Sequence, residues 1–461
     1  MMDNRIHQLK SSASIKGDYI LCWMQQSQRI AYNHALIRAI NLSNDHQLPL
    51  VVYFGVTDHY PEANLRHYHF MMEGLQDLQN KFNSLKIRFV ILKTSPEIGC
   101  IELMKHASFL VMDKGYTRIQ RQWRQEVLHA AQNMNINVDE VESDLVIPIE
   151  TASNKEEYAA RTIRTKIMSK IRAYAIEPDD AAPQISSLDL VFDLPFEEIT
   201  DPMVYLKSLD IDTSIKPSTR FRGGEAEAHK VFSGFLEDRL PNYTLRNHPE
   251  LDYCSYLSPY LHFGHISPIE IVVRTMDALR SKPELEESVD SFIEELVVRR
   301  ELSHNFIYFN PNYDSFKGMT YQWAYDTMEL HNEDQRDYLY SIEEFESCAT
   351  HDPYWNAAMK EMVHTGFMHT YMRMYWCKKI IEWTPDCETA YEIAISLNNK
   401  YFLDGRDANS FTGVAWCFGK HDRAWTERPV FGKLRYMNEN GLKRKFDIDA
   451  YVKKIDLMIG E

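Results

Sequence analysis

The feature that most constrains this chain is a regular alternation of short apolar runs with longer amphipathic stretches over residues 19–141. Short runs rich in β-branched residues are typical of buried strands, and apolar residues that recur every three or four positions are typical of helices. The strand-like runs are 19–23, 49–54, 87–92, 108–112 and 136–141, and the helical stretches are 33–42, 65–81 and 119–132. This order predicts a Rossmann-like α/β domain, in which a parallel sheet carries helices on both faces.

Ligands of such sheets bind beyond the carboxyl ends of the strands. The first strand-like run is not followed by a G-x-G-x-x-G sequence, so a nicotinamide cofactor is not indicated. We therefore expect this domain to be a scaffold or to bind an accessory ligand.

The character of the chain changes after residue 177. Residues 154–177 form a charged helical stretch, and 178–218 are rich in Asp, Pro and Ser without clear periodicity, as in a linker. Beyond Gly223 the pattern is helical almost throughout, with apolar periodicity in 225–240, 268–279, 289–309, 355–383 and 389–401. We expect an α/β domain at 1–177, a linker at 178–222 and an all-α domain at 223–461.

Bulk composition fits a globular enzyme of two or three domains, because the 461 residues are 44% hydrophobic and 26% charged. No run of about 18 apolar residues could span a bilayer, and the start lacks the apolar stretch of a signal peptide. We therefore expect an intracellular, soluble protein, in the cytoplasm or nucleus. The seven scattered cysteines form no C-x-x-C pair and predict free thiols. A net charge of −16 means that any nucleic-acid site must be local.

Six of the eight tryptophans lie in the helical part, at Trp323, Trp355, Trp376, Trp383, Trp416 and Trp425. One interpretation is core packing, which is the usual role of tryptophan. A second is electron transfer, because Trp376 and Trp383 are seven residues apart, or about 10 Å along one helix face. Electrons can hop between indoles over such a separation.

Several ordered motifs resemble those of class II cyclobutane-dimer photolyases, within the photolyase and cryptochrome family. The motifs are 155–164 (KEEYAARTIR), 257–264 (LSPYLHFG), 294–301 (EELVVRRE), 350–356 (THDPYWN), 371–379 (YMRMYWCKK), 403–406 (LDGR) and 421–425 (HDRAW). A series of this kind is more specific than any single short pattern. The resemblance extends from about Tyr19 to the C-terminus.

The resemblance implies a U-shaped FAD, active in its reduced form FADH−, buried in the helical domain. The cofactor-binding residues that it assigns are Tyr243, Cys254, Ser255, Tyr256, Leu257, Ser258, Arg373, Asn398, Asp404, Gly405 and Arg406. The turn at 254–258 would hold the pyrophosphate. Asn398 would face flavin N5, where an amide can donate and accept. The alternatives are a capped turn, a helix cap and a purely structural Arg373–Asp404 ion pair.

The tryptophans take defined places in this resemblance. Trp376 is the donor nearest the flavin, Trp355 the middle relay and Trp383 the solvent-side end. This chain would reduce the resting flavin under light and so support activation rather than repair itself. Together with Glu295 and Asn398, these three residues form the expected catalytic set, whereas packing is the expected role of Tyr375.

The substrate implied by the resemblance is a pyrimidine dimer flipped out of UV-damaged DNA. Its expected contacts are Glu295 and Asn247 at the base edges, Met374 and Trp416 as an apolar wall, and Arg246, Arg423, Trp425 and Arg435 at the rim. In a dry cleft Glu295 could carry a proton and stabilise the dimer radical anion. The alternative is an ion pair of Glu295 with Arg299 or Arg300.

A run of basic residues in the C-terminal part predicts a local phosphate-binding surface. It comprises Lys420, Arg423, Arg428, Lys433, Arg435, Lys443, Arg444 and Lys445. For Lys443–Lys445 a solvated charged face is the alternative.

The expected function is light-driven repair of cyclobutane pyrimidine dimers by electron transfer from excited reduced FAD, the reaction of a deoxyribodipyrimidine photo-lyase. The alternative is a cryptochrome-like photoreceptor without repair activity. Repair of the (6-4) photoproduct would need a histidine pair where Asn247 and Met374 stand. We expect a monomer without an obligate protein partner and without a metal site. A deazaflavin-type antenna in the α/β domain is possible in this family, although residues 113–118 depart from the usual motif.

Overall fold

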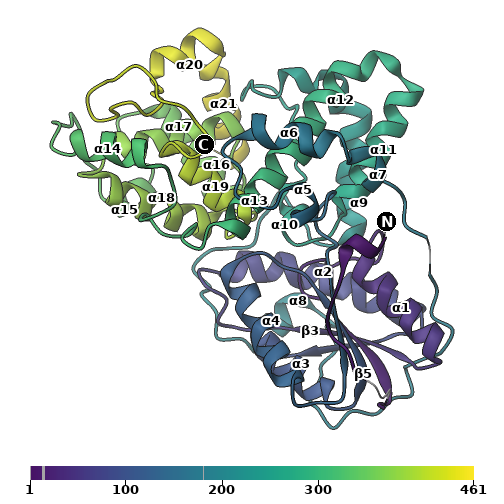
Figure 1. The fold of residues 1–461 in the computed structure, drawn as a ribbon. Coiled ribbons are helices and arrows are strands. Elements are labelled where there is room, and N and C mark those ends of the chain that lie inside the picture. Colours follow the sequence, from purple (N-terminus) through teal and green to yellow (C-terminus); the bar gives the residue numbers. More distant parts are fainter. Residues whose placement is uncertain (1, 13–15, 180, 461) are drawn as a thin grey trace.

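A six-stranded sheet dominates the N-terminal part of this computed structural model, which describes residues 2–12, 16–179 and 181–460 (Figure 1). Its strands are β1 (Ile6–Lys10), β2 (Tyr19–Trp23), β3 (Leu50–Gly55), β4 (Arg88–Leu92), β5 (Ala107–Asp113) and β6 (Asn137–Val141), in the spatial order β1-β6-β5-β2-β3-β4. Strands β2 to β6 pair in parallel, which confirms the predicted sheet. The edge strand β1 pairs antiparallel with β6 and was not predicted, because its half-exposed residues form no apolar run.

Helices cover both faces of this sheet, as the alternation predicted. They are α1 (His34–His46), α2 (Leu65–Ser84), α3 (Pro96–Met104) and α4 (Arg118–Ala131). Successive strand residues point to opposite faces. Ile20 and Val52 therefore pack in the core under α1 and α2, whereas Leu21 and Tyr53 pack in a separate core under α3 and α4. Helix α3 was not predicted.

The C-terminal part is helical, as expected. Its α-helices are α9 (Glu225–Gly234), α10 (Ser258–His262), α11 (Pro268–Ser281), α12 (Glu286–Ile293), α13 (Arg300–Phe309), α14 (Gln322–Leu330), α15 (Ile342–Glu346), α16 (Pro353–Thr365), α17 (Thr370–Glu382), α18 (Cys387–Tyr401), α19 (Ala408–Cys417), α20 (Glu439–Lys445) and α21 (Ile448–Ile459). The predicted stretch 355–383 is two helices, because Gly366 ends α16 at a φ of 78°. A π-helical segment, η5 (Glu294–Arg299), joins α12 to α13.

The segments between the two parts are more structured than a linker. The short helices α5 (Ile149–Ala152), α6 (Ala160–Met168) and α7 (Ile171–Tyr174) precede residue 177, and α8 (Pro202–Leu206) follows it. Ile163 of α6 packs in the core of the helical half with Phe232, whereas Leu206 of α8 packs on the sheet half. The chain therefore reaches the helical half, returns to the sheet and crosses again, and our division at 177 and 222 stays a proposal. No helix among the described residues is long and apolar enough to span a bilayer.

Candidate functional site

The turn 254–258 lies directly before α10, as the motif predicted. Neither Ser255 nor Ser258 caps that helix: its N-cap position is Leu257, without a side-chain hydrogen bond. The Ser255 hydroxyl does accept the backbone N–H of Leu257 at 3.4 Å, so the capped-turn alternative stays open. Tyr256 has a φ of 60° and a buried ring.

Two arginines that the sequence analysis missed stack on the ring of Tyr256. The guanidinium carbon of Arg220 lies 4.1 Å from the ring centroid, and that of Arg239 lies 5.2 Å from it. Neither residue belongs to one of the family motifs, and Arg220 falls within the supposed linker. Their positive charges make the surroundings of the turn suitable for phosphate.

Tyr243, the other predicted phosphate contact, lies in an aromatic cluster. Its ring contacts those of Phe235 and Phe292, at centroid distances of 5.5 and 5.2 Å. Burial raises the pKa of the Tyr243 phenol, so it remains neutral. The guanidinium of Arg246 stands 5.0 Å from the ring centroid.

Arg373 and Asp404 form the predicted ion pair. Nη2 of Arg373, on α17, donates to both carboxylate oxygens of Asp404 at 3.0 Å. The guanidinium also stacks on Phe402, 3.9 Å from the ring centroid. Asp404 belongs to a tight turn after α18, in which a Cβ at Gly405 would stand 2.8 Å from the backbone oxygen of Asn398. Glycine is therefore required for this turn to approach Asn398.

Asn398 is buried in the last turn of α18 and does not cap the helix. Its side-chain amide donates to Oδ1 of Asn399 at 3.0 Å. The helix-cap alternative is therefore wrong for Asn398, and its contact with a flavin stays a prediction.

The three predicted relay tryptophans lie together. Nε1 of Trp355 donates to the backbone oxygen of Trp376 at 3.0 Å, and the rings of Trp355 and Trp383 contact each other at a centroid distance of 6.0 Å. Nε1 of Trp376 is buried and has no hydrogen-bond partner among the described residues. Trp383 is only 3% exposed, so it does not itself meet solvent. The rings of His351 and Tyr340 cover it, at 5.0 and 5.6 Å.

Glu295 pairs with Arg246, not with Arg299 or Arg300 as the alternative held. Nη2 of Arg246 lies 2.9 Å from Oε1 of Glu295, while Nε of Arg299 lies 3.0 Å from Oε1 of Glu294. The π-helical segment explains this pairing, because a π-turn makes positions i and i+5 neighbours. Arg299 therefore faces Glu294, and Glu295 is left for Arg246. Arg300 pairs with Asp144 at 2.9 Å.

The predicted apolar wall is half-buried. The carbonyl of Met374, on α17, accepts from the thiol of Cys417, the last residue of α19, and Trp416 precedes Cys417 on that helix. The guanidinium of Arg299 stands 5.2 Å from the centroid of Trp416. Asn247 is exposed, and its chain neighbour Arg246 is half-buried.

Arg423 and Arg435 lie beside one exposed indole, whereas the fourth predicted rim residue, Arg246, pairs with Glu295. Trp425 is 40% exposed, and the guanidinium carbons of Arg423 and Arg435 lie 5.2 and 5.6 Å from its ring centroid. Lys420 does not belong to this surface: it is buried and pairs with Glu156. The prediction that Lys420 contributes to phosphate binding is therefore wrong.

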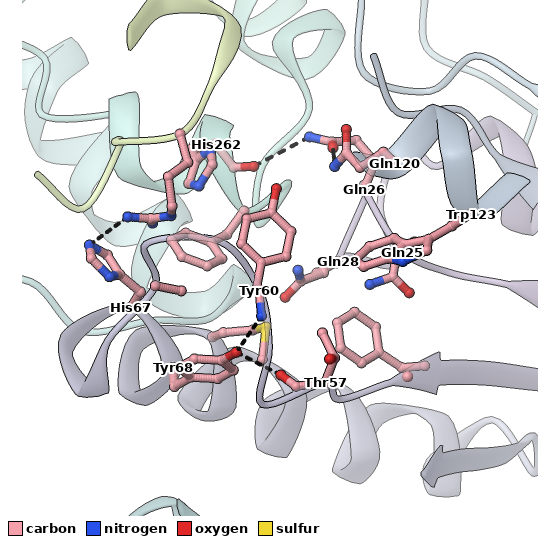
Figure 2. A pocket seen from close by; sticks show the side chains of 16 residues that line it. Gln25, Gln26, Gln28, Thr57, Tyr60, His67, Tyr68, Gln120, Trp123 and His262 are labelled. Atoms are coloured by element: carbon pink, nitrogen blue, oxygen red, sulfur yellow. Dashed lines mark hydrogen bonds between the residues drawn. The ribbon is translucent and has the colours of Figure 1, made fainter. Parts of the chain in front are cut away.

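A pocket lies between the two halves, beyond the carboxyl ends of β2 and β3 (Figure 2). This is the edge at which the sheet order placed an accessory ligand. Its polar lining includes Gln25, Gln26, Gln28, Gln120 and His262, and its aromatic lining includes Phe54, Tyr60, Tyr68, Trp123 and Phe263.

Arg406 also lines this cavity, although the motif assigned it to the flavin. Its Nη1 donates to the backbone oxygen of Asn399 at 2.6 Å and lies 2.9 Å from Nε2 of His67, which itself donates to the backbone oxygen of Phe402. Burial holds the pKa of His67 well below its usual value, so the ring is neutral. Burial also lowers the pKa of Arg406 to about 10, which leaves it charged at neutral pH.

Comparisons with known proteins show what this chain is similar to. The family model described as DNA photolyase matches residues 20–184. A deoxyribodipyrimidine photo-lyase of Methanothermobacter thermautotrophicus is 45% identical over 97% of this chain and 96% of its own length. Two solved structures share the fold: a Synechocystis cryptochrome (TM-score 0.75, 17% identity, 94% of this chain and 88% of that one) and a Sulfolobus tokodaii photolyase with two FAD molecules (TM-score 0.71, 16% identity, 94% and 89%).

Proposed function

Because the chain belongs to the DNA photolyase family, we propose that it is a deoxyribodipyrimidine photo-lyase that splits cyclobutane pyrimidine dimers in DNA under light. The observation that carries this proposal is that residues matched to three different roles lie close together on α17. Arg373 pairs with Asp404, Nε1 of Trp355 donates to the backbone oxygen of Trp376, and Met374 stands between Arg373 and Trp376 in the chain. A flavin site, a lesion wall and the first indole of a relay thus share one rigid helix.

FAD is the cofactor that fits these residues. The unpartnered Nε1 of Trp376 is a buried donor, a kind of group that proteins rarely leave unused. Arg220 and Arg239 beside Tyr256 suit a pyrophosphate, and Arg373 with Asp404 would hold the ring system. When bound in its reduced form, FAD supplies the photoexcited electron that splits the dimer.

The protein residues bind the lesion and exclude water from it. Without DNA, Arg246 forms an ion pair with Glu295. A phosphate of bound DNA would compete with Glu295 for Arg246. Glu295 would then be available to the polar edge of a flipped pyrimidine, with Met374 and Trp416 as the apolar wall. Trp425, Arg423 and Arg435 would meet the opened strand.

We propose that the interdomain cavity holds a planar accessory chromophore of the deazaflavin type. Its aromatic lining suits a flat ring, and its glutamines offer amide donors and acceptors for ring oxygens and nitrogens. Arg406 adds a buried positive charge that donates to a backbone carbonyl, which favours a ligand with an anionic group.

A light-dependent repair assay tests the proposed photo-lyase activity. Purified protein carrying reduced FAD is incubated with a dimer-containing oligonucleotide under blue light and in the dark, and restored pyrimidines are counted. We expect restoration only in the light. Equal amounts of restored pyrimidines in the illuminated and dark samples would contradict the proposal. The flavin photoreceptor would then be the remaining interpretation. A matched Glu295→Gln variant keeps hydrogen bonding but removes the charge, and it should repair more slowly while it retains flavin.

A further inference from the structure

A tight hairpin carries the proposed DNA contacts Trp425 and Arg435, and we call residues 425–435 the rim hairpin. The backbone N–H of Trp425 donates to the oxygen of Lys433 at 2.8 Å, and Arg428 and Gly432 exchange two backbone hydrogen bonds of 2.9 and 2.8 Å. Phe431, at its tip, is buried. The position of Trp425 therefore depends on what holds this hairpin.

The hairpin lies directly on the C-terminal end of α14. Oγ1 of Thr327 accepts the backbone N–H of Lys433 at 2.9 Å. A Cβ at Gly432 would stand 2.2 Å from the same oxygen, and Gly432 has a φ of 50°. Only glycine allows this approach.

His331, the first residue after α14, ties the hairpin to this end through two carboxylates. Its Nδ1 lies 2.6 Å from Oδ2 of Asp334, and its Nε2 lies 3.1 Å from Oε1 of Glu427, in the hairpin. Oδ2 of Asp334 also accepts the backbone N–H of Val430, in the hairpin, at 2.8 Å. Both ring nitrogens must donate to satisfy two carboxylates, and only the protonated imidazole has two N–H groups.

Two cations also lie near His331, but the two carboxylates outweigh them. Nζ of Lys433 lies 4.0 Å from Oε2 of Glu427, and Arg336 donates to the backbone oxygen of Asp334. The hydrogen bond to Asp334, followed by that to Glu427, raises the pKa of His331 above its usual value of 6.5. The N–H of Val430, followed by His331, lowers the pKa of Asp334.

We infer that protonated His331 pins the rim hairpin to the end of α14, which makes His331 a positioning residue for DNA binding. The inference rests on the proposed function for its DNA contacts. When the pKa of a histidine is raised in the folded state, its ion pairs contribute fully to stability at pH values below its ordinary pKa. This contribution is lost as the pH rises through the raised pKa. DNA affinity should therefore fall as the pH is raised above about 6.5.

The first experiment needs no DNA and no flavin. Hydrogen exchange of amides 425–435 is measured at about pH 6 and about pH 8.5, corrected for intrinsic exchange, and His331 is titrated by NMR. Protection should fall at the higher pH in the wild type, and His331→Gln should be poorly protected at both. Asp334→Asn should lower the measured pKa of His331. Unchanged protection in His331→Gln would overturn the inference.

The second experiment measures affinity for a dimer-containing duplex across the same pH range. We expect the wild type to weaken about fivefold or more and His331→Gln to lack this pH-dependent loss. His59→Gln is the control, because the His59 side chain is 82% exposed and pairs with Asp58 in the sheet half. Identical pH profiles in the wild type and His331→Gln would overturn the inference. Absence of wild-type binding at every pH would instead contradict the proposed function.

Discussion

Replacing Gly264 by alanine should weaken the contact between the sheet half and the helical half. Gly264 follows α10 and has a φ of 68°. A Cβ there would stand 2.1 Å from the backbone oxygen of Gln26 and 2.7 Å from Cα of Ser27, both in the loop after β2. The carbonyl of Gly264 also accepts Nη1 of Arg29 at 3.1 Å. Backbone of one half therefore touches backbone of the other at this position.

The loss of folding free energy in Gly264→Ala has two contributions, a strained backbone and a steric clash. An alanine in the left-handed region costs about 1–2 kcal/mol. Ordinary contacts of a Cβ begin at 3.4 Å, so the two backbones must separate by roughly 1 Å, and such overpacking typically costs about 1–3 kcal/mol. We expect the free energy of unfolding to fall by about 2–5 kcal/mol in total.

Urea unfolding of the flavin-free protein, followed by circular dichroism and tryptophan fluorescence, measures this loss. If the two halves unfold in separate steps, the two signals will diverge, and each step is fitted by itself. Gly413→Ala is the matched control, because Gly413 lies in α19 and a Cβ added to it would meet no atom within 4 Å, so this variant should gain up to about 1 kcal/mol. If Gly264→Ala were as stable as the wild type, the close approach of Gly264 to the backbone of Gln26 and Ser27 would be refuted.

Three further predictions concern single side chains. Trp376→Phe should abolish photoreduction of oxidised flavin, seen by absorbance, yet spare repair by chemically reduced protein; loss of both would refute the relay. Asp404→Asn leaves Arg373 without its carboxylate and should weaken FAD binding about tenfold in a fluorescence titration, whereas unchanged affinity would make the pair purely structural. Burial raises the pKa of Glu301 to about 8 from an ordinary 4.5, so the neutral acid is favoured by folding and stability falls as pH rises between these values. In Glu301→Gln the free energy of unfolding should no longer fall over this pH range. If it still falls, another group is responsible for the pH dependence.

Local sequence patterns predicted a strand correctly where all of its residues are buried, and they missed a strand whose residues are partly exposed. Strand β2 begins and ends where its apolar run does, because all five residues are buried. Strand β1 was missed because its residues are only partly buried or exposed, as in a loop. The break between α16 and α17 depends on the left-handed conformation of Gly366, which periodicity alone does not reveal.

For the candidate site, sequence motifs predicted the helix on which several residues lie but not the partners of their charged groups. Motifs placed Arg373, Met374 and Trp376 on one helix, and the structure agrees. The partner of Glu295 was missed because Arg246 is 49 positions away in the chain, a contact set by tertiary packing. Lys420 was misplaced for the same reason, since its charge is neutralised by the distant Glu156.

The π-helical segment η5 acts as a built-in insertion within an otherwise continuous rod from α12 to α13. An i→i+5 turn holds one residue more than the i→i+4 turn of an α-helix, so deleting one residue within η5 would restore regular winding and leave α12 and α13 facing the same neighbours. The same deletion within α13 would instead turn one side of that helix by about 100° relative to the other. The widened turn should therefore tolerate the loss of one residue better than the regular helices beside it.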